Sequence, residues 1–268
     1  MKDLKVFALL LRLRPSWGYS VKVPNTSASQ PSLSLPPPTT LVGAVAYGVL
    51  KLQGRDQETE ISGGRLTNFA EKLWSATVYS GASLNGFGAP IMDISKYIIR
   101  IYQRKANRDR PEYQLGAIPT GKVYVTGEIR ALLGFHEERL SKIVEKFDEV
   151  LPKASYLVTR LGAKESIVSV EEVKWGYSKV LGREVEFCSS FYQPLQHSVP
   201  LGGCDGQGFF YKETFWDGGF FDVGEERGYL VPGVRDKYIS SLRGKFKADK
   251  SCEVHEFEGE GFVVCDVR

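Results

Sequence analysis

Basic and aromatic side chains are concentrated in the middle of this chain, over residues 96–130. The positive charges of this stretch outnumber its negative charges by more than the formal net charge of +3 of the whole 268-residue chain. Cationic side chains neutralise phosphates and planar rings stack on bases, so the pattern is typical of a nucleic-acid-binding surface. The alternative is a solvated hairpin whose charged edges prevent aggregation. The stretch contains Lys96, Arg100, Arg104, Lys105, Arg108, Arg110, Lys122 and Arg130, with Tyr97, Tyr102, Tyr113 and Tyr124 between them.

Two shorter segments carry the same chemistry. Near the N-terminus, a basic and aromatic cluster leads into a proline-rich segment. Further along, residues 159–166 place Gly162 between Arg160 and Lys164, and a glycine turn of this kind offers backbone N–H groups and cations to a phosphate. The alternative for this second segment is an ordinary hairpin turn. The N-terminal cluster consists of Arg12, Arg14, Trp17 and Tyr19.

Catalytic motifs are largely missing. His136-Glu137 lacks the second histidine of a metalloprotease, and the glycine-rich residues 202–208 lack the Lys-Ser/Thr ending of a phosphate-binding loop. A metal-independent ribonuclease needs a base, an acid and a cation that converge on a 2′-hydroxyl. Tyr47, His136 and His197 are candidates for such a set, but their spacing does not bring them together. We therefore expect the histidines to be structural.

The four cysteines lie in the C-terminal third of the chain. Cys252 and His255 have the spacing of zinc ligands, but no Cys-x-x-Cys pair accompanies them, so we expect no metal and no cofactor. Buried free thiols are the leading expectation, and one disulfide is the alternative if the source is a hyperthermophile. The cysteines are Cys188, Cys204, Cys252 and Cys265.

The composition is that of an ordinary globular protein, with 42% hydrophobic and 25% charged residues. The apolar run at residues 6–11 is shorter than the core of a secretory signal and is followed by Arg12 and Arg14. No run approaches the roughly 20 apolar residues of a membrane-spanning helix. We expect a cytoplasmic protein that does not contact a membrane.

Hydrophobic periodicity predicts the elements that position these residues. Residues 5–14 alternate as a strand, with one fully apolar face that would receive helices and a second face that turns basic. Pro36-Pro37-Pro38 then leads into a helix, which Thr39 or Thr40 would cap and Gly54 would end. The small residues of this helix would let another backbone approach closely. They are Gly43, Ala44, Ala46 and Gly48.

The remaining pattern alternates between strands and helices. The best helix spans 137–151, where Pro152 would end it, and a shorter helix spans 66–74. Residues 81–88 hold three glycines and are expected to form a loop. Strands are expected at 94–104 and 121–129, which together fit a long hairpin, and at 77–80, 156–161, 167–173, 184–188 and 209–212, with a closing hairpin of 253–257 and 261–267.

This order predicts an α+β fold, in which a ferredoxin-like antiparallel sheet carries two helices on one face. Residues 1–180 would form this core, with the hairpin at about 94–130. Residues 181–268 would form a β-rich C-terminal extension, because the chain there is rich in glycine and aromatic residues.

Two motifs resemble those of a known family. The run Pro-Pro-Pro-Thr-Thr-Leu-Val-Gly at 36–43 is similar to the entry into the first helix of the Cas-five family of CRISPR-associated RAMP proteins. Arg160-Leu161-Gly162, followed by Ser-Ile-Val at 166–168, is similar to the downstream glycine motif of that family. The order of elements extends the likeness beyond the motifs, though not to the C-terminal third. In its length and overall sequence character, the chain resembles the archaeal type I-A branch of this family.

The resemblance implies a role in antiviral defence. Such a protein has an RRM-type, ferredoxin-like domain with a protruding β-hairpin thumb. It is a non-catalytic subunit of a type I CRISPR surveillance (Cascade) complex, where it binds the 5′ handle of CRISPR RNA and caps the filament of backbone subunits. Its further partner is the large subunit, and it meets target DNA only through the complex.

On this resemblance we assign two RNA-binding regions. The handle groove is lined by Arg12, Arg14, Trp17 and Tyr19, with Arg160, Gly162 and Lys164 nearby. The basic thumb consists of Arg100, Tyr102, Arg104, Lys105 and Arg108. The chain lacks the aromatic motif with which RRM strands stack bases, so grip by loops, backbone amides and the thumb fits better.

Two alternative functions remain. One branch of the family is a metal-independent endoribonuclease that cleaves repeat RNA with a first-helix tyrosine and a lysine–histidine pair. Tyr47 lies on the corresponding helix, but the chain contains no Lys-His dipeptide. The third possibility is a purely structural subunit that contacts only protein partners.

Overall fold

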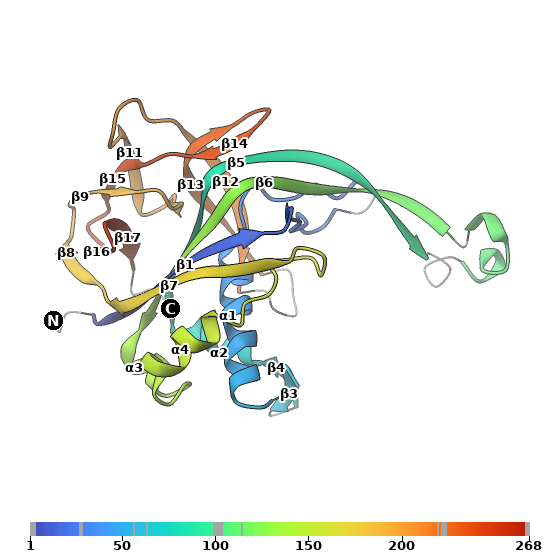
Figure 1. Ribbon diagram of the computed structural model, residues 1–268, viewed down its shortest axis with the longest axis horizontal. Helices are drawn as coiled ribbons and strands as arrows, with labels where there is room; N and C mark the ends of the chain where they lie inside the picture. The colour runs from blue at the N-terminus through green and yellow to red at the C-terminus, as the bar shows by residue number, and fades with distance from the viewer. Residues whose placement is uncertain are drawn as a thin grey trace.

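The computed structural model describes residues 4–26, 29–55, 57–62, 64–98, 104–113, 115–218, 220 and 224–265. Its central sheet contains four long strands: β1 (Val6–Pro15), β5 (Thr77–Ile98), β6 (Leu115–His136) and β7 (Val168–Tyr177). They lie in the order β5-β6-β1-β7, and each neighbouring pair is antiparallel (Figure 1). The short strand β2 (Gly18–Tyr19) also pairs with β6.

Helices pack on one face of this sheet (Figure 1). Two of them, α1 and α2, lie between β1 and β5 in the sequence, and the other two, α3 and α4, lie between β6 and β7. The predicted mixture of strands and helices is confirmed. The helices are α1 (Pro38–Leu52), α2 (Phe69–Ala76), α3 (Glu137–Ser141) and α4 (Phe147–Ser155).

β1 packs its apolar face against the helices, as its alternation predicts, and the first half of its other face is buried as well, which the alternation did not predict. Phe7, Leu9 and Leu11 belong to the main hydrophobic core, together with side chains of α1, α2 and α4. On the opposite face, Val6 and Leu10 belong to a second core with aromatic residues of the C-terminal region. Full burial of such a side chain contributes about 1.5–3 kcal/mol, which makes β1 the centre of the fold.

α1 begins where the prolines predict, but not with the predicted cap. The capping residue is Pro37, whose carbonyl accepts hydrogen bonds from the N–H groups of Thr40 and Leu41 at 3.0 and 3.3 Å. No threonine side chain caps the helix, because Thr39 and Thr40 already lie within its first turn. A proline at the first helical position needs no partner for an N–H. Gly54 follows the helix in a left-handed conformation, as predicted.

Two predicted helices differ from those observed. The first turn of the expected helix at 66–74 is instead a strand, β4 (Arg65–Asn68), paired with β3 (Thr59–Ser62), and Asn68 caps α2 through the N–H of Glu71. The expected helix at 137–151 is two helices, because Lys146 adopts a left-handed conformation with φ of 50° and redirects the chain.

Pro152 lies inside α4 rather than ending a helix, so α4 reaches Ser155. The strand expected at 156–161 is therefore wrong. Residues 157 and 158 continue as turns, since their N–H groups donate to the carbonyls of Ala154 and Ser155. Val158 and Leu161 are buried in the main core.

β5 and β6 form a long hairpin that projects far beyond the rest of the molecule (Figure 1). The pairing runs from Thr77 opposite Phe135 to Ile98 opposite Leu115. The strands expected at 77–80 and 121–129 are parts of these longer strands, and the strand expected at 94–104 is found as far as Ile98. Residues 99–103 lie outside the described residues, and Arg104 precedes the 3-10 helix at 105–107 instead of continuing the strand. The tip contains two short 3-10 helices, η2 (Lys105–Asn107) and η3 (Pro111–Tyr113).

The loop expected at residues 81–88 is wrong, because its glycines lie within β5. Gly86 stands opposite Gly127 of β6, and both have positive φ values, of 133° and 105°. A Cβ at Gly86 would lie 1.9 Å from the carbonyl oxygen of Thr126. The glycines therefore allow two strands to approach and twist where side chains would collide.

The C-terminal region is rich in strands, as predicted, and partly extends the central sheet through the pairing of β14 with β5. β13 continues this extension by pairing with β14, and β10 and β12 pair with β13. The remaining strands form two separate sheets, in the orders β11-β15-β9 and β17-β16-β8. The bounds are β8 (Lys179–Gly182), β9 (Glu186–Ser189), β10 (Gln193–Pro194), β11 (Ser198–Gly203), β12 (Phe210–Asp217), β13 (Glu225–Arg235), β14 (Ile239–Ser241), β15 (Gly244–Ala248), β16 (Glu253–Phe257) and β17 (Glu260–Val264).

All four cysteines form disulfides, so the expectation of free thiols is wrong. Cys188 is bonded to Cys204, and Cys252 is bonded to Cys265. The second bond closes the predicted terminal hairpin, because Cys252 and Cys265 flank the pairing of β16 with β17. Sequence spacing alone gave no pairing.

A search of the described residues found no helix with the length and apolar character needed to cross a membrane.

Candidate nucleic-acid interface

Residues 17–20, which follow β1, and residues 159–166, which we call the glycine loop, are joined by hydrogen bonds in the structure. The N–H of Ala163 donates to the carbonyl of Ser20 at 2.9 Å, and the N–H of Ser20 donates to Ser166 Oγ at 3.0 Å. Trp17 Nε1 donates to the carbonyl of Glu165 at 2.8 Å. A loop far along the sequence is thus fixed against the segment that follows β1.

The same loop faces α1 across a cavity of about 270 Å³. An adjoining cavity of about 310 Å³ shares Thr40, Gly43, Tyr47 and Glu58 with it. We call these two cavities together the α1 groove. The first cavity is lined by Thr40, Gly43, Ala44, Tyr47, Glu58, Thr159, Arg160 and Gly162.

The small residues of α1 have two different roles. Gly48 faces α4, where an added Cβ would lie 2.1 Å from the carbonyl oxygen of Ala154, so Gly48 permits the predicted close backbone approach. Gly43 has no atom within 4 Å of an added Cβ, so it leaves the groove open. Thr40, Gly43 and Tyr47 share one helix face with Ala44 through i, i+3, i+4 and i+7 spacing. That spacing was the available sequence signal for the groove.

Two cationic side chains lie on the side of the α1 groove that residues 159–166 form. Arg160 lines it directly, and Lys164 is exposed on the same loop. In the part of the chain that the structure describes, neither side chain has a carboxylate within ion-pair distance. Across the groove, Lys51 Nζ lies 5.5 Å from the centre of the Tyr47 ring. The arrangement suits an anion that carries planar groups.

The loop amides contribute less than the sequence predicts. The N–H groups of Leu161, Ala163 and Ser166 already donate to carbonyl groups of the chain, so these three amides are not available to a phosphate. Gly162 has φ of 81° and lies against Ser20, where a Cβ would approach the Ser20 carbonyl oxygen to 2.6 Å. Its glycine is thus required by the packing of the loop.

Arg12 lies outside the α1 groove and is fully engaged by acidic side chains. Its guanidinium donates to Glu128 at 2.7 and 3.0 Å and to Glu172 at 3.0 Å. These bonds raise the pKa of Arg12, and the bonds from Arg12 lower the pKa of Glu128. Arg12 therefore holds β6 and β7 to β1, and its contacts with two carboxylates do not favour the role predicted for it in an RNA groove.

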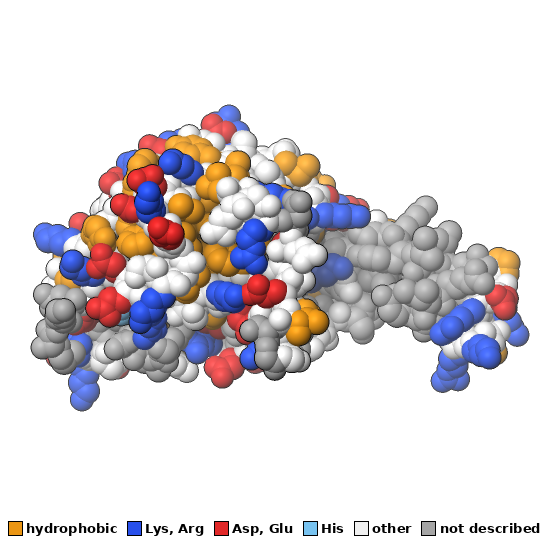
Figure 2. Space-filling view, turned by 90° about the horizontal axis from the view of Figure 1, so that it is seen from below, with side chains coloured by type: hydrophobic (Ala, Val, Ile, Leu, Met, Phe, Trp, Pro, Cys, Tyr) orange, Lys and Arg blue, Asp and Glu red, His pale blue; other side chains and the backbone are white. Residues whose placement is uncertain are grey.

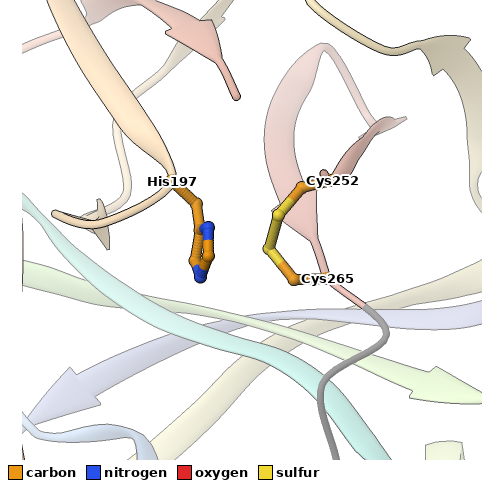
Figure 3. Close-up of side chains that lie close together, drawn as sticks. All are labelled: His197, Cys252 and Cys265. Carbon is orange, nitrogen blue, oxygen red and sulfur yellow. A yellow bond between two sulfur atoms is a disulfide. The ribbon is translucent and has the colours of Figure 1, made fainter. Parts of the chain in front are cut away.

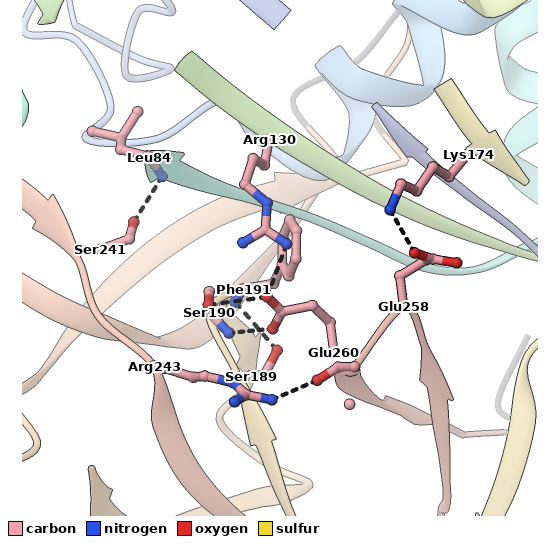
Figure 4. Close-up of polar contacts among 12 residues, drawn as sticks. Leu84, Arg130, Lys174, Ser189, Ser190, Phe191, Ser241, Arg243, Glu258 and Glu260 are labelled. Atoms are coloured by element: carbon pink, nitrogen blue, oxygen red, sulfur yellow. Dashed lines mark hydrogen bonds and ion pairs between the residues drawn. The ribbon is translucent and has the colours of Figure 1, made fainter. Parts of the chain in front are cut away.

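Arg130 is neutralised in the same way. Its guanidinium lies 2.9 Å from Glu260, which is buried and also accepts hydrogen bonds from the N–H and the hydroxyl of Ser190 (Figure 4). The Arg130 guanidinium also lies 5.0 Å from the centre of the Phe191 ring. This member of the basic stretch connects β6 to the C-terminal region.

Tyr19 is completely buried, so it does not line a groove and that prediction is wrong. Its hydroxyl donates to the carbonyl of Ser34, and burial raises the pKa of the phenol. Ser34 in turn donates to Glu213, which also accepts a hydrogen bond from Arg235 at 2.8 Å. Tyr19 anchors the proline-rich segment instead.

Trp17 and Arg14 remain at the surface. Arg14 is exposed and lies 3.7 Å from Glu171. The Trp17 ring lies 5.3 Å from the Tyr124 ring and 5.4 Å from Lys122 Nζ, at the base of the β5–β6 hairpin. Tyr124 and Lys122 extend the expected aromatic and cationic cluster, although sequence order does not reveal that they meet Trp17.

The hairpin tip carries exposed cations. Arg104, Lys105 and Arg108 are exposed there, and Figure 2 shows blue side chains gathered at this far end of the molecule. Arg100 and Tyr102, the other residues assigned to the thumb, lie outside the described residues.

The histidines do not complete a catalytic site with Tyr47. All three are described, and none of them lines the α1 groove. His136 accepts a hydrogen bond from the N–H of Glu138 at the start of α3, and His255 is buried beside Ser178. His197 lies near the Cys252–Cys265 disulfide.

Comparison with known proteins identifies the family. No family model matches the chain. The chain is 34% identical over 247 residues to CRISPR-associated protein Cas5 3 of Saccharolobus solfataricus, covering 90% of this chain and 94% of that protein. It is 32% identical over 250 residues to the CRISPR system aCascade subunit Cas5 1 of the same organism, covering 92% of each.

The fold is also found in a solved structure. A CRISPR protein from Archaeoglobus fulgidus matches with a TM-score of 0.62 and 22% identity, over 97% of this chain and 99% of that one. These similarities define the class as CRISPR-associated proteins. The chain belongs to the Cas5 family within that class. The resemblance inferred from the two sequence motifs is confirmed, and the archaeal relatives agree with the archaeal branch.

Proposed function

We propose that the chain is a subunit of a CRISPR surveillance complex, where it binds the 5′ handle of CRISPR RNA and caps the backbone filament. Family membership supports this proposal, and one relative is named as an aCascade subunit. The observation that carries it is the meeting of the α1 face and the glycine loop in one groove, with Arg160 in its lining.

We further interpret the core as ferredoxin-like, with the β5–β6 hairpin as the thumb. The sequence order of β1, α1, β5, β6, α4 and β7 corresponds to the β-α-β-β-α-β unit of that fold. The antiparallel order β5-β6-β1-β7 with helices on one face supports the same interpretation.

The RNA path follows contacts that connect the groove to the hairpin. From Arg160 and Lys164, the loop reaches Trp17 through the hydrogen bond to the Glu165 carbonyl. Trp17 in turn lies beside Tyr124 at the base of the hairpin. Single-stranded RNA is recognised by cations along its backbone and rings that stack on its bases, and this series offers both.

The hairpin tip completes the proposed path. Arg104 and Lys105 are exposed far from the body, where they reach RNA beyond the handle or a neighbouring subunit. The backbone subunit and the large subunit are the proposed protein partners, and target DNA meets the chain only through the complex. Because a tip on a long two-stranded arm contributes little to folding, its charges can be removed without unfolding the body.

The test measures binding of a synthetic handle RNA by fluorescence anisotropy over a series of salt concentrations. Arg160→Ala with Lys164→Ala should weaken binding and reduce the slope of log affinity against log salt by about 0.7 for each lost phosphate contact. Arg183→Ala is the matched control, because Arg183 is a surface arginine of the C-terminal region paired with Glu253. An unchanged slope in the double variant, or an equal loss in the control, would refute the groove assignment.

We also propose that the subunit is not catalytic. Tyr47 lies in the α1 groove with Arg160, which favours the endoribonuclease alternative to that extent. A general acid and base pair is required in addition. Incubation with repeat RNA in EDTA should leave the RNA intact. Cleavage that Tyr47→Phe abolishes would establish the alternative, and binding of partners without any RNA would establish the purely structural one.

A further inference from the structure

His197 lies beside the Cys252–Cys265 disulfide, in a part of the molecule remote from the α1 groove in sequence (Figure 3). The ligand atoms of the three residues, one from each side chain, all lie within 4.8 Å of one another. Sequence spacing pointed to His255 as the partner of Cys252. The structure instead stacks the His255 ring on Phe262, at 5.8 Å between ring centres.

The backbone holds these three residues together without the sulfur–sulfur bond. β16 and β17 are paired from Glu253 opposite Val264 to Phe257 opposite Glu260, so the two cysteines flank an intact ladder. The N–H of Asp249 donates to the carbonyl of His197 at 3.0 Å, and the N–H of Cys252 donates to the carbonyl of Asp249 at 3.2 Å. Reduction of the disulfide therefore leaves two thiols and an imidazole in the same place.

His197 also has an unsatisfied ring nitrogen. Its Nδ1 is buried and has no hydrogen-bond partner. Buried polar atoms are nearly always paired, so the unpaired Nδ1, on a ring that has a nitrogen within 4.8 Å of both sulfurs, indicates that this ring could hold a ligand. Thiolate and imidazole together are the donors that zinc prefers.

We propose that reduction of the Cys252–Cys265 bond creates a site for a zinc-type divalent cation, with Cys252, Cys265 and His197 as ligands. A dithiol reductant gives two electrons and two protons to the disulfide and becomes a disulfide itself. The cation then displaces the two thiol protons, which leave to solvent, and binds two thiolates and the imidazole lone pair. The oxidised protein does not bind, because disulfide sulfurs carry no thiolate charge.

A cavity gives the reductant and the cation access to Cys265 and His197. Cys265 and His197 line a cavity of about 230 Å³, whose other lining residues include Glu225 and Glu226. Cys252 is almost fully buried, whereas Cys265 is partly exposed, so a thiolate attacks at the Cys265 sulfur. A water molecule from this cavity would be the fourth ligand, since His197 and Cys265 both line it.

The experiment titrates Co²⁺ into the full chain, with and without prior reduction by a dithiol, and follows the thiolate-to-cobalt charge-transfer band. Zn²⁺ is then added to displace cobalt and to measure affinity and stoichiometry. The matched control is Cys188→Ser with Cys204→Ser, which removes the other disulfide. Within the described residues, neither Cys188 nor Cys204 belongs to a potential ligand cluster.

We expect the titration to give a stoichiometry of one cobalt ion per reduced chain and no bound cobalt in the oxidised chain. The control variant should behave like the wild type. Cys252→Ser with Cys265→Ser should abolish the band, and His197→Ala should lower the affinity at least by the roughly tenfold typical of changes around a metal site. Circular dichroism of each sample tests whether it is folded.

Three results would overturn the proposal. The first is a reduced, folded wild type without the thiolate band. The second is equal binding in His197→Ala and the wild type, which would mean that the thiols bind alone. The third is loss of the fold on reduction in the control variant, since the ladder of β16 and β17 would then not hold the ligands.

Discussion

Two glycines of α1 predict opposite effects of the same substitution. Gly48→Ala places a Cβ 2.1 Å from the carbonyl oxygen of Ala154 and 2.8 Å from its carbon, so α1 and α4 must separate by roughly 1 Å to restore van der Waals contact. Overpacking of this kind costs about 1–3 kcal/mol. Alanine recovers about 0.5–1 kcal/mol of that through its better helix propensity. The net loss is then at most about 2.5 kcal/mol, and because the 2.1 Å contact is with backbone that cannot rotate away, we expect a value in the upper half of that range.

Gly43→Ala should gain the helix propensity of alanine without any cost of overpacking. No atom lies within 4 Å of the added Cβ, and Gly43 is inside the helix, so the variant should gain about 0.5–1 kcal/mol. The two variants share one helix and one chemical change, and each serves as the control for the other. Together they separate packing against α4 from propensity.

The assay is equilibrium unfolding in denaturant with the disulfides intact. The midpoint should fall for Gly48→Ala and rise for Gly43→Ala, with the dependence on denaturant unchanged. Gly43→Leu then tests function, because its side chain fills the α1 groove and should reduce handle binding while the fold persists. A Gly48→Ala protein as stable as the wild type would refute the close approach of α1 to α4, and a destabilised Gly43→Ala protein would refute the open groove.

Two further predictions concern buried charge. Arg12→Ala should lower the unfolding midpoint, since it leaves buried Glu128 without its main partner, and added Glu128→Gln should restore part of the loss. Its handle affinity should equal that of the wild type, and a large loss would return Arg12 to the RNA path. Burial lowers the pKa of His255 from its ordinary value of 6.5 to about 4. At pH values below 6.5, His255 is therefore protonated in the unfolded chain but still neutral in the folded one. Stability should therefore fall by up to about 1.4 kcal/mol per pH unit from 6.5 toward 4. In His255→Asn this slope should flatten, and an unchanged profile would contradict the assignment.

The periodicity of apolar residues predicted the strands and hairpins whose structure depends mainly on neighbouring residues in the sequence. The alternation of β1 predicted the apolar face that packs on the helices, but not the burial of Val6 and Leu10 under the C-terminal region, and the closing hairpin at 253–257 was found with its turn. The helix expected at 137–151 kept its apolar spacing but broke at Lys146, whose left-handed conformation is not encoded by periodicity. The glycines of β5 predicted a loop, because the sequence near them does not show the close approach of β6 at Gly127 that requires a glycine at position 86.

The candidate site was harder to predict, because it depends on contacts between distant parts of the chain. Arg12 and Glu172 are 160 positions apart, and only the register of β1 with β7 brings them together. Nothing near Arg12 in sequence signals this neutralisation. Arg160 and Gly162 line the α1 groove from a surface turn, and loops of this kind can be located from sequence because connecting segments lie at the surface. Whether they contact RNA stays a prediction.

The arrangement of the two sheet faces explains why the proposed RNA path leaves the sheet. A domain that stacks bases on its sheet needs an open face, and the helices cover one face of this sheet. Phe191 and Phe262 of the C-terminal region pack on the other face, beside Leu10. On the same face, the partly exposed Arg12 forms ion pairs with Glu128 and Glu172, which reduces its attraction for a phosphate. Cations with exposed side chains remain on the glycine loop and at the hairpin tip, so the proposed RNA path uses these two regions and the α1 groove rather than the sheet.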